Sequence, residues 1–244
     1  MQLSNIYIGT ISVITNVDTW KEIAPPMGKD KQWVPGRSAK ELAEYMTSTY
    51  PALPCEMENI LCNFTDANAE FDWAAEYVTK LEPFGLGRGE GRNHDAFLYN
   101  GDLVVGIEGK ADEPLGSQLI GEALKSATPN KAHRINGMIQ MLFGGTPEKH
   151  SHIRYQLITA STATLLEATK KNVKKALLLV IVFKRPGSFS YDKIKANNQD
   201  IDNFLRDISA KQIDGYYLLP TKYGKETGIN LFFKKIELDL PALT

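Results

Sequence analysis

The chain has 244 residues, of which 43% are hydrophobic and 23% charged, the balance of a globular protein with a sizeable core. No stretch approaches the roughly 18 consecutive apolar residues of a membrane helix, and no signal peptide pattern stands at the N-terminus. We therefore expect a cytoplasmic protein. The two cysteines, Cys55 and Cys62, match no zinc signature and are expected to be buried or semi-buried thiols.

Charge is distributed unevenly along the chain. The formal net charge of −1 argues against strong nucleic-acid binding when taken alone. However, residues 126–244 carry 18 Lys and Arg against 10 Asp and Glu, whereas residues 1–125 carry 10 against 19. This asymmetry favours a polyanion-binding surface in the second half and a cation site in the first. The alternative is that the two halves simply attract each other.

The first third of the chain predicts a strand, a loop and a helix. Residues 5–14 are rich in Ile and Val and indicate a strand. Residues 24–36 hold three prolines and two glycines, which indicate a loop. A helix is expected over 38–49, with Ser38 as its N-cap and Glu41 completing a capping box.

The middle of the chain predicts a flexible loop followed by a hairpin. Residues 71–82 fit either a helix or a strand. Glycine then occupies every second position from 85 to 91, which indicates a loop with unusual backbone freedom. Residues 93–112 form two apolar runs around Asn100-Gly101, the strongest short-range signal for a β-hairpin.

The second half predicts helices around one central strand. The run 176–183 is continuously apolar, as in a strand covered on both faces of a sheet. Apolar residues at helical spacing indicate helices over 117–126, 130–143 and 149–171 and around 201–208, and short strands are expected at 215–219 and 229–238. The absence of any flexible linker predicts a single domain over residues 1–244.

The hairpin turn fixes which side chains share a face. A type I′ turn at Asn100-Gly101 would pair Asp95 with Gly106 and place Glu108 diagonally across from Asp95. One face would then be apolar, and His94 would point to the face opposite Asp95. The other face would carry Asp95, Phe97, Tyr99, Val104, Glu108, Lys110 and Asp112.

Two carboxylates and an ammonium on one face suit a metal-assisted hydrolysis. Asp95 and Glu108 offer hard oxygen ligands for Mg²⁺ or Mn²⁺, with the Gly109 carbonyl as a further candidate ligand. Lys110 would orient the attacking water or stabilise charge on a phosphate. The alternative is a surface salt bridge on a half-exposed strand.

These residues resemble the motif of the PD-(D/E)XK nuclease superfamily, the fold of restriction endonucleases. Asp95 matches the acid on the second core strand, and Glu108-Gly-Lys110 matches the Glu-x-Lys on the third. Gln156 matches the Gln of the Gln-x-x-x-Tyr found in some members, with Ala160 in place of the Tyr. The strings Trp33-x-Pro-Gly-Arg-Ser38, Glu108-Gly-Lys-Ala-Asp-Glu-Pro114 and Arg154-Tyr-Gln-Leu157 also resemble an uncharacterised bacterial branch of this superfamily.

The resemblance implies an α/β fold with a mixed central sheet flanked by helices. Its αβββαβ core would span about 37–184, with inserted helices and extra terminal strands. It implies a metal-dependent nuclease acting on DNA, of the kind that serves bacterial restriction or defence, acting as a homodimer or with a partner protein. Weaker site candidates are Glu41, Asp112 and Gln156, and candidate nucleic-acid contacts are Lys149, His152 and Arg154.

Two other functions stay open at this level. The first is a nuclease fold that has lost its chemistry and binds nucleic acid or a partner protein, which predicts salt-sensitive DNA binding without cleavage. The second is an enzyme of another class, in which the glycine-rich loop at 85–91 binds a nucleotide. It predicts that a nucleotide, rather than Mg²⁺ alone, raises the melting temperature.

Overall fold

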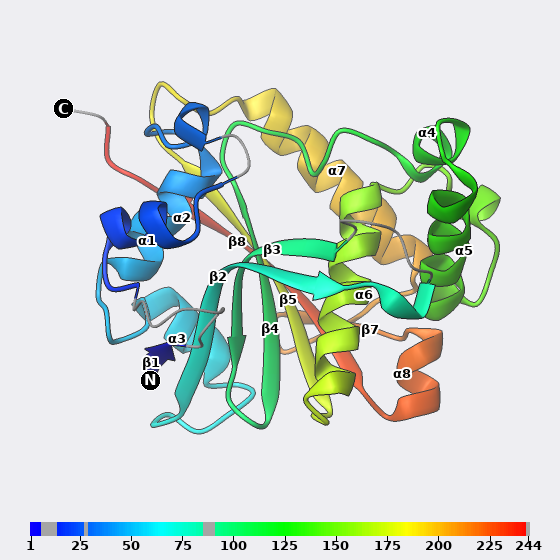
Figure 1. Cartoon of the computed structure of the whole chain (residues 1–244), viewed down its shortest axis with the longest axis horizontal. Helices are drawn as coiled ribbons and strands as arrows, with labels where there is room; N and C mark the ends of the chain where they lie inside the picture. The colour runs from blue at the N-terminus through cyan, green and yellow to red at the C-terminus, as the bar shows by residue number, and fades with distance from the viewer. Residues whose placement is uncertain (6–13, 27–28, 85–90, 243–244) are drawn as a thin grey trace.

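A computed structural model describes residues 1–5, 14–26, 29–84 and 91–242 (Figure 1). One sheet of eight strands crosses the molecule in the order β1-β2-β3-β4-β5-β8-β7-β6. Its strands are β1 (Gln2–Asn5), β2 (Glu70–Lys80), β3 (Gly91–Tyr99), β4 (Leu103–Lys110), β5 (Lys175–Lys184), β6 (Lys211–Ile213), β7 (Tyr216–Leu219) and β8 (Asn230–Asp239).

Helices cover both faces of this sheet. The α-helices are α1 (Val17–Ile23), α2 (Ser38–Thr47), α3 (Cys55–Leu61), α4 (Ile120–Lys125), α5 (Pro129–Phe143), α6 (Tyr155–Lys170), α7 (Tyr191–Asp207) and α8 (Lys222–Thr227). Short 3-10 helices are η1 (Lys29–Lys31), η2 (Glu82–Phe84) and η3 (Pro147–His150). No helix within the described ranges is long and apolar enough to cross a membrane.

Two apolar cores lie on opposite faces of the sheet. Trp20, Leu42 and Met57 bring α1, α2 and α3 against one face, and Ile139, Ile158 and Phe204 bring α5, α6 and α7 to the other. Strand β5 lies between β4 and β8, is parallel to both, and alternates its residues between the two cores. Burial on both faces explains its continuous apolar sequence.

The helices and strands that carry the site follow one another along the chain in the order α2, β2, β3, β4, α6, β5. Strands β2, β3 and β4 form an antiparallel meander, and α6 connects β4 to the parallel strand β5. Helices α4 and α5 lie between β4 and α6 in the chain, and β8, β7 and β6 extend the sheet beyond β5. The protein is thus of the α/β class with a mixed sheet flanked by helices, as the sequence predicts.

Several sequence predictions need correction. The ambiguous segment 71–82 is a strand. The helix expected over 149–171 begins only at Tyr155. Arg154 has extended backbone and forms a β-bridge with Leu119, and the Ile153 carbonyl accepts a hydrogen bond from the Ile120 amide. Cys55 and Cys62 are free and exposed rather than buried. Most of the strand expected at 5–14 and the glycine loop at 85–90 lie outside the described residues.

The predicted hairpin register is also wrong. Phe97 pairs with Gly106, and Tyr99 pairs with Val104 rather than Asp102. Gly101 alone in the turn has a positive φ, so the type I′ turn does not form, and the Asn100 side chain accepts hydrogen bonds from the amides of residues 102 and 103 instead. The slip is two residues, which preserves the face of each side chain because strands alternate with a period of two.

Candidate active site

Beside the predicted site, the regular alternation of side chains between the two faces of the sheet is interrupted at the same level in β2 and β3. Ala75 pairs with Ala96 and Tyr77 with His94. Ala75 and Ala96 lie in the core under α1–α3, whereas the Tyr77 ring stacks on Phe97 on the α6 side. Glu76, at the break between these pairs, has a φ of 48°. The irregularity turns His94 toward the α6 face, so its expected position on the opposite face is wrong.

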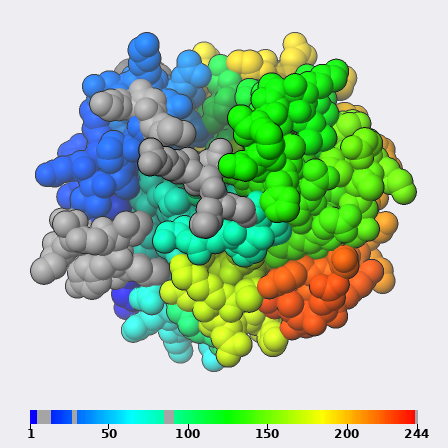
Figure 2. All heavy atoms as spheres, turned by 45° about the vertical axis from the view of Figure 1, so that its right-hand side comes forward, coloured from blue at the N-terminus to red at the C-terminus, as the bar shows by residue number. Residues whose placement is uncertain are grey.

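A pocket of about 560 Å³ opens beside this irregularity. Its walls come from the segment before and at the start of α2, from β2, β3 and β4, from the loop after β4 and from α6. The lining residues are Pro26, Lys31, Gln32, Arg37, Ser38, Ala39, Glu76, Arg92, Asn93, Asp95, Lys110, Glu113, Pro114, Gly116, Ser117 and Gln156. In Figure 2 the N-terminal segment (blue) and the segment of α4 and α5 (green) flank strands β2 and β3 (teal). The pocket therefore joins parts of the chain that are distant in sequence, and Asp95 and Lys110 both line it.

Glu108 lies beneath the pocket and is only 2% exposed. Its Oε1 atom is 3.2 Å from Nδ1 of His94. Its Oε2 atom accepts hydrogen bonds from the Arg92 guanidinium and from the Gln156 amide at 2.7 Å. Burial opposes ionisation, but Arg92, the His94 hydrogen bond and Lys110 outweigh it and lower the pKa of Glu108 to about 2.

Asp95 and Glu76 are carboxylates with the opposite tendency. Burial and the neighbouring charge of Glu108 raise the pKa of Asp95 to about 6, although the Gly109 amide donates a 2.8 Å hydrogen bond to its Oδ2. Burial and the charge of Asp95 raise the pKa of Glu76 to about 8, and the Asn93 amide donates a hydrogen bond to Oε2 of Glu76. Three carboxylates, one buried and two half-buried, thus repel one another at this site.

Lys110 and Arg92 supply the positive charge of this region. Lys110 is only 6% exposed, yet it lines the pocket and favours the ionised forms of Asp95 and Glu108. Glu76, Asp95 and Glu108 outnumber these two cations if all are ionised. A divalent cation bound here would add positive charge beside the three acids.

The donor set fits Mg²⁺ or Mn²⁺ in its chemistry. Carboxylate oxygens are the ligands that Mg²⁺ prefers, and one or two suffice because the ion keeps several waters. Asp95 and Glu108 would hold it, with Glu76 nearby. Among the described residues, no group of three or more His, Cys, Asp or Glu side chains is arranged as a metal site. The expected ligation by the Gly109 carbonyl stays a prediction.

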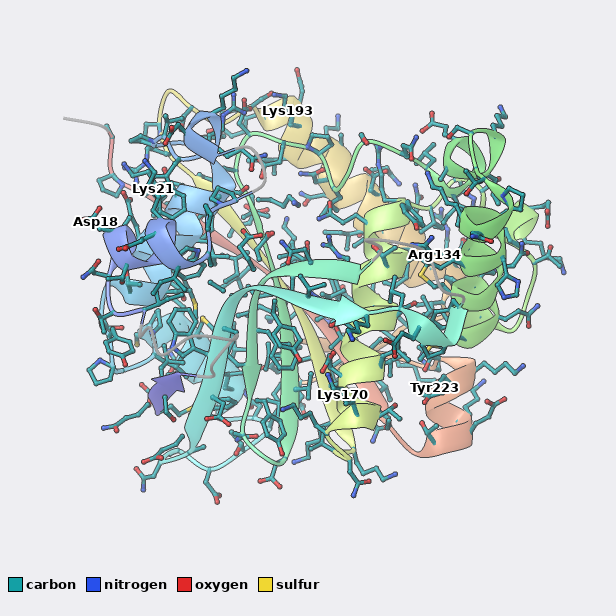
Figure 3. The ribbon with its side chains drawn as sticks, viewed as in Figure 1. Asp18, Lys21, Arg134, Lys170, Lys193 and Tyr223 are labelled. Carbon is teal, nitrogen blue, oxygen red and sulfur yellow. The ribbon has the colours of Figure 1, made fainter. Side chains whose placement is uncertain are left out.

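Two of the weaker candidates have partners elsewhere. Glu41 is 1% exposed and accepts hydrogen bonds from Arg185 and the Gly36 amide. The capping box is wrong, because Arg37 is the N-cap of α2 and no side chain caps it. Asp112 pairs at 3.1 Å with Lys193, which Figure 3 shows near the start of α7. Neither lines the pocket, whereas Gln156 does.

The predicted nucleic-acid contacts are mostly engaged with α7. His152 lies 3.3 Å from Asp207, and Arg154 donates to Asp200 at 2.7 Å and reaches the Gly116 carbonyl on the pocket rim. Lys149 lines a separate pocket at the end of α5. The structure therefore brings Arg154 near the pocket but not the other two residues of that set.

Sequence reasoning missed Glu76, Arg92 and the role of His94. Arg92 follows the glycine-rich segment, and Glu76 stands within a mostly apolar strand, which are weak signals. The backbone irregularity that brings them together depends on a positive φ at Glu76, and glutamate is not a residue type that indicates this conformation in a sequence. Only the pairing of β2 with β3 reveals it.

The fold and site define an α/β protein with a pocket lined by half-buried carboxylates beside an antiparallel meander. The chain belongs to the family described as a domain of unknown function, DUF6946, which matches residues 13–239. No curated protein and no solved structure matches the chain.

Proposed function

We propose that the protein is a metal-dependent nuclease that hydrolyses phosphodiester bonds, with DNA as its substrate. The observation that carries the proposal is the set Asp95, Glu108, Lys110 and Gln156, assembled from β3, β4 and α6 around one pocket. The order of α2, β2, β3, β4, α6 and β5 matches the αβββαβ core that the resemblance implies. Biological settings such as restriction or defence, and assembly as a homodimer, remain parts of this proposal.

The residues of the chain have separable roles in this reaction. Bound Mg²⁺ or Mn²⁺ would supply an activated water and polarise a phosphoryl oxygen. Asp95 and Glu108 would hold the cation through their carboxylate oxygens, and Gln156 restrains Glu108 from α6. Lys110 donates to the water or to the phosphate oxygen that gains charge in the transition state. Arg37 and Lys31, on the pocket wall, attract the phosphate backbone.

Cleavage of plasmid and linear DNA with Mg²⁺ or Mn²⁺ tests the proposal. Wild type is compared with Lys110→Ala and Asp95→Asn, and Asp112→Asn serves as the matched acid outside the pocket. We expect metal-dependent cutting by wild type and Asp112→Asn and loss of cutting in the two pocket variants. Cutting that persists in both pocket variants would remove the site assignment.

A second candidate, a binding module without chemistry, has one observation in its favour. Arg92, His94 and Gln156 hydrogen-bond both oxygens of Glu108 from within the chain, as in a carboxylate with a structural role. This candidate predicts no cleavage by any variant but DNA affinity that falls steeply with salt. Fluorescence anisotropy of labelled DNA between 50 mM and 200 mM salt, about the range over which phosphate contacts weaken, distinguishes the two.

A further inference from the structure

His94 is a fully buried polar side chain in direct contact with the proposed site. Its exposed fraction is 0%, and its Nδ1 atom lies 3.2 Å from Oε1 of Glu108. Its other nitrogen, Nε2, is buried and has no hydrogen-bond partner among the described residues. A buried histidine with one nitrogen committed and one unpartnered needs an explanation, because buried polar atoms are normally paired.

The hydrogen bonds of Glu108 indicate which nitrogen of the His94 ring donates. Oε2 of Glu108 accepts from the Arg92 guanidinium and from the Gln156 amide, so the carboxylate acts as an acceptor on that side. Nδ1 of His94 faces Oε1 of the same carboxylate and donates to it in the same way. Nε2 takes no part in holding Glu108.

Counting lone pairs shows which oxygen of Glu108 remains open. Each carboxylate oxygen accepts about two hydrogen bonds. Arg92 and Gln156 take both positions on Oε2, whereas His94 takes one on Oε1. One acceptor position on Oε1 therefore remains, and His94 is the group that fixes its direction.

The surroundings hold the ring in place. A Cβ atom on Gly106 would lie 2.7 Å from Cε1 of His94 and 2.6 Å from Oγ1 of Thr164, so the ring occupies space that a larger residue would fill. The face change between residues 94 and 96 sends the side chain into this space between β4 and α6. Gly106, in the same strand as Glu108, and the irregularity in β3 thus together fix the position of the His94 ring.

We propose that His94 is a positioning residue that aims Oε1 of Glu108 at the divalent cation of the proposed nuclease. The inference rests on the proposed function, because it assigns the cation to that oxygen. His94 touches neither substrate nor the reacting atoms. It acts through Glu108, in the way that hydrogen-bond partners of metal-binding carboxylates tune affinity.

Mn²⁺ affinity, measured by isothermal titration calorimetry without DNA, tests this role. His94→Asn places an amide donor near the position of Nδ1, whereas His94→Leu removes the donor at similar bulk. Loss of such a partner typically weakens metal binding by about 10–100-fold. We expect that loss for His94→Leu and an affinity close to wild type for His94→Asn.

A third variant and a melting curve separate positioning from folding. His94→Gln keeps an amide but places it near Nε2, so it should lose Mn²⁺ affinity like His94→Leu while retaining a folded chain. Equal Mn²⁺ affinity in wild type, His94→Leu and His94→Gln would overturn the inference and leave the proposed function standing. Equal losses in His94→Asn and His94→Leu would also overturn it. Failure of wild type to bind Mn²⁺ would overturn the proposed function, and the inference with it.

Discussion

Glu41 and Glu108 are two buried glutamates with different surroundings. Glu41 is 1% exposed and meets one cation, Arg185, through two hydrogen bonds to its two oxygens. Glu108 is 2% exposed but shares Arg92 and Lys110 with Asp95, whose pKa is raised. The first charge is paired with one arginine, whereas the second belongs to a cluster in which several acids share their cations.

This difference shows why burial and an ion pair do not identify a functional acid. Glu41 joins α2 to the end of β5, because Arg185 follows β5 and also donates to the Pro241 carbonyl. Its role is complete without any added group. Glu108 lies beside a pocket that Asp95, Glu76 and Lys110 line, where the proposed function would have a cation bind. The comparison predicts opposite responses to removing charge from the two sites.

The largest expected effect comes from breaking the balanced pair. Arg185→Ala leaves Glu41 buried and unpaired, which should lower the free energy of unfolding by about 3–5 kcal/mol. Urea denaturation followed by circular dichroism measures it. The double variant Glu41→Leu with Arg185→Leu should recover much of the loss, and a double variant as unstable as the single one would contradict this account.

Removing charge from the pocket should affect activity instead. Glu108→Gln keeps the side-chain shape but removes the charge that favours a cation, so we expect cleavage to fall by about 10²–10³-fold, as when one transition-state stabilising group is lost. Initial rates on linear DNA at saturating Mn²⁺ measure the effect. An unchanged rate would show that an acid other than Glu108 holds the cation.

Asp95→Asn should stabilise the metal-free protein, in contrast to Arg185→Ala. A raised pKa in the folded state means that ionised Asp95 costs stability, so wild type loses stability as pH rises from below its unfolded pKa through about 6. In EDTA at pH 8 the variant should exceed wild type by about 1–2 kcal/mol. Thermal melts at pH 4 and pH 8 measure this, and the advantage should shrink at pH 4. A destabilised variant at pH 8 would show that Asp95 is structural.

The smallest effect is expected at Asp112. Its pair with Lys193 is partly exposed, so Asp112→Asn should change the free energy of unfolding by about 0–1 kcal/mol and leave cleavage unchanged. The same two assays measure both quantities. A loss of activity comparable to that of Glu108→Gln would return Asp112 to the list of metal ligands.

Sequence alone determined the α/β class and the shared face of Glu108 and Lys110. The alternation along β4 and the continuous apolar run of β5 are local patterns, and a slip of two residues in the hairpin leaves them unchanged. The match of Gln156 also depended only on its place near the start of α6. These features survive because they depend on strand and helix periodicity rather than on exact pairing.

Tertiary structure alone decided which side chains meet at the site. The positive φ at Glu76 and the face change at His94 depend on the pairing of β2 with β3, and the partnership of Glu41 with Arg185 joins residues 144 positions apart. Hydrogen bonds and ion pairs of this kind form between chain segments that no local pattern relates. The sequence therefore pointed to Asp95 and Glu108, and the packing of strands and helices decided that Glu76 lies with them and that Glu41 is paired elsewhere.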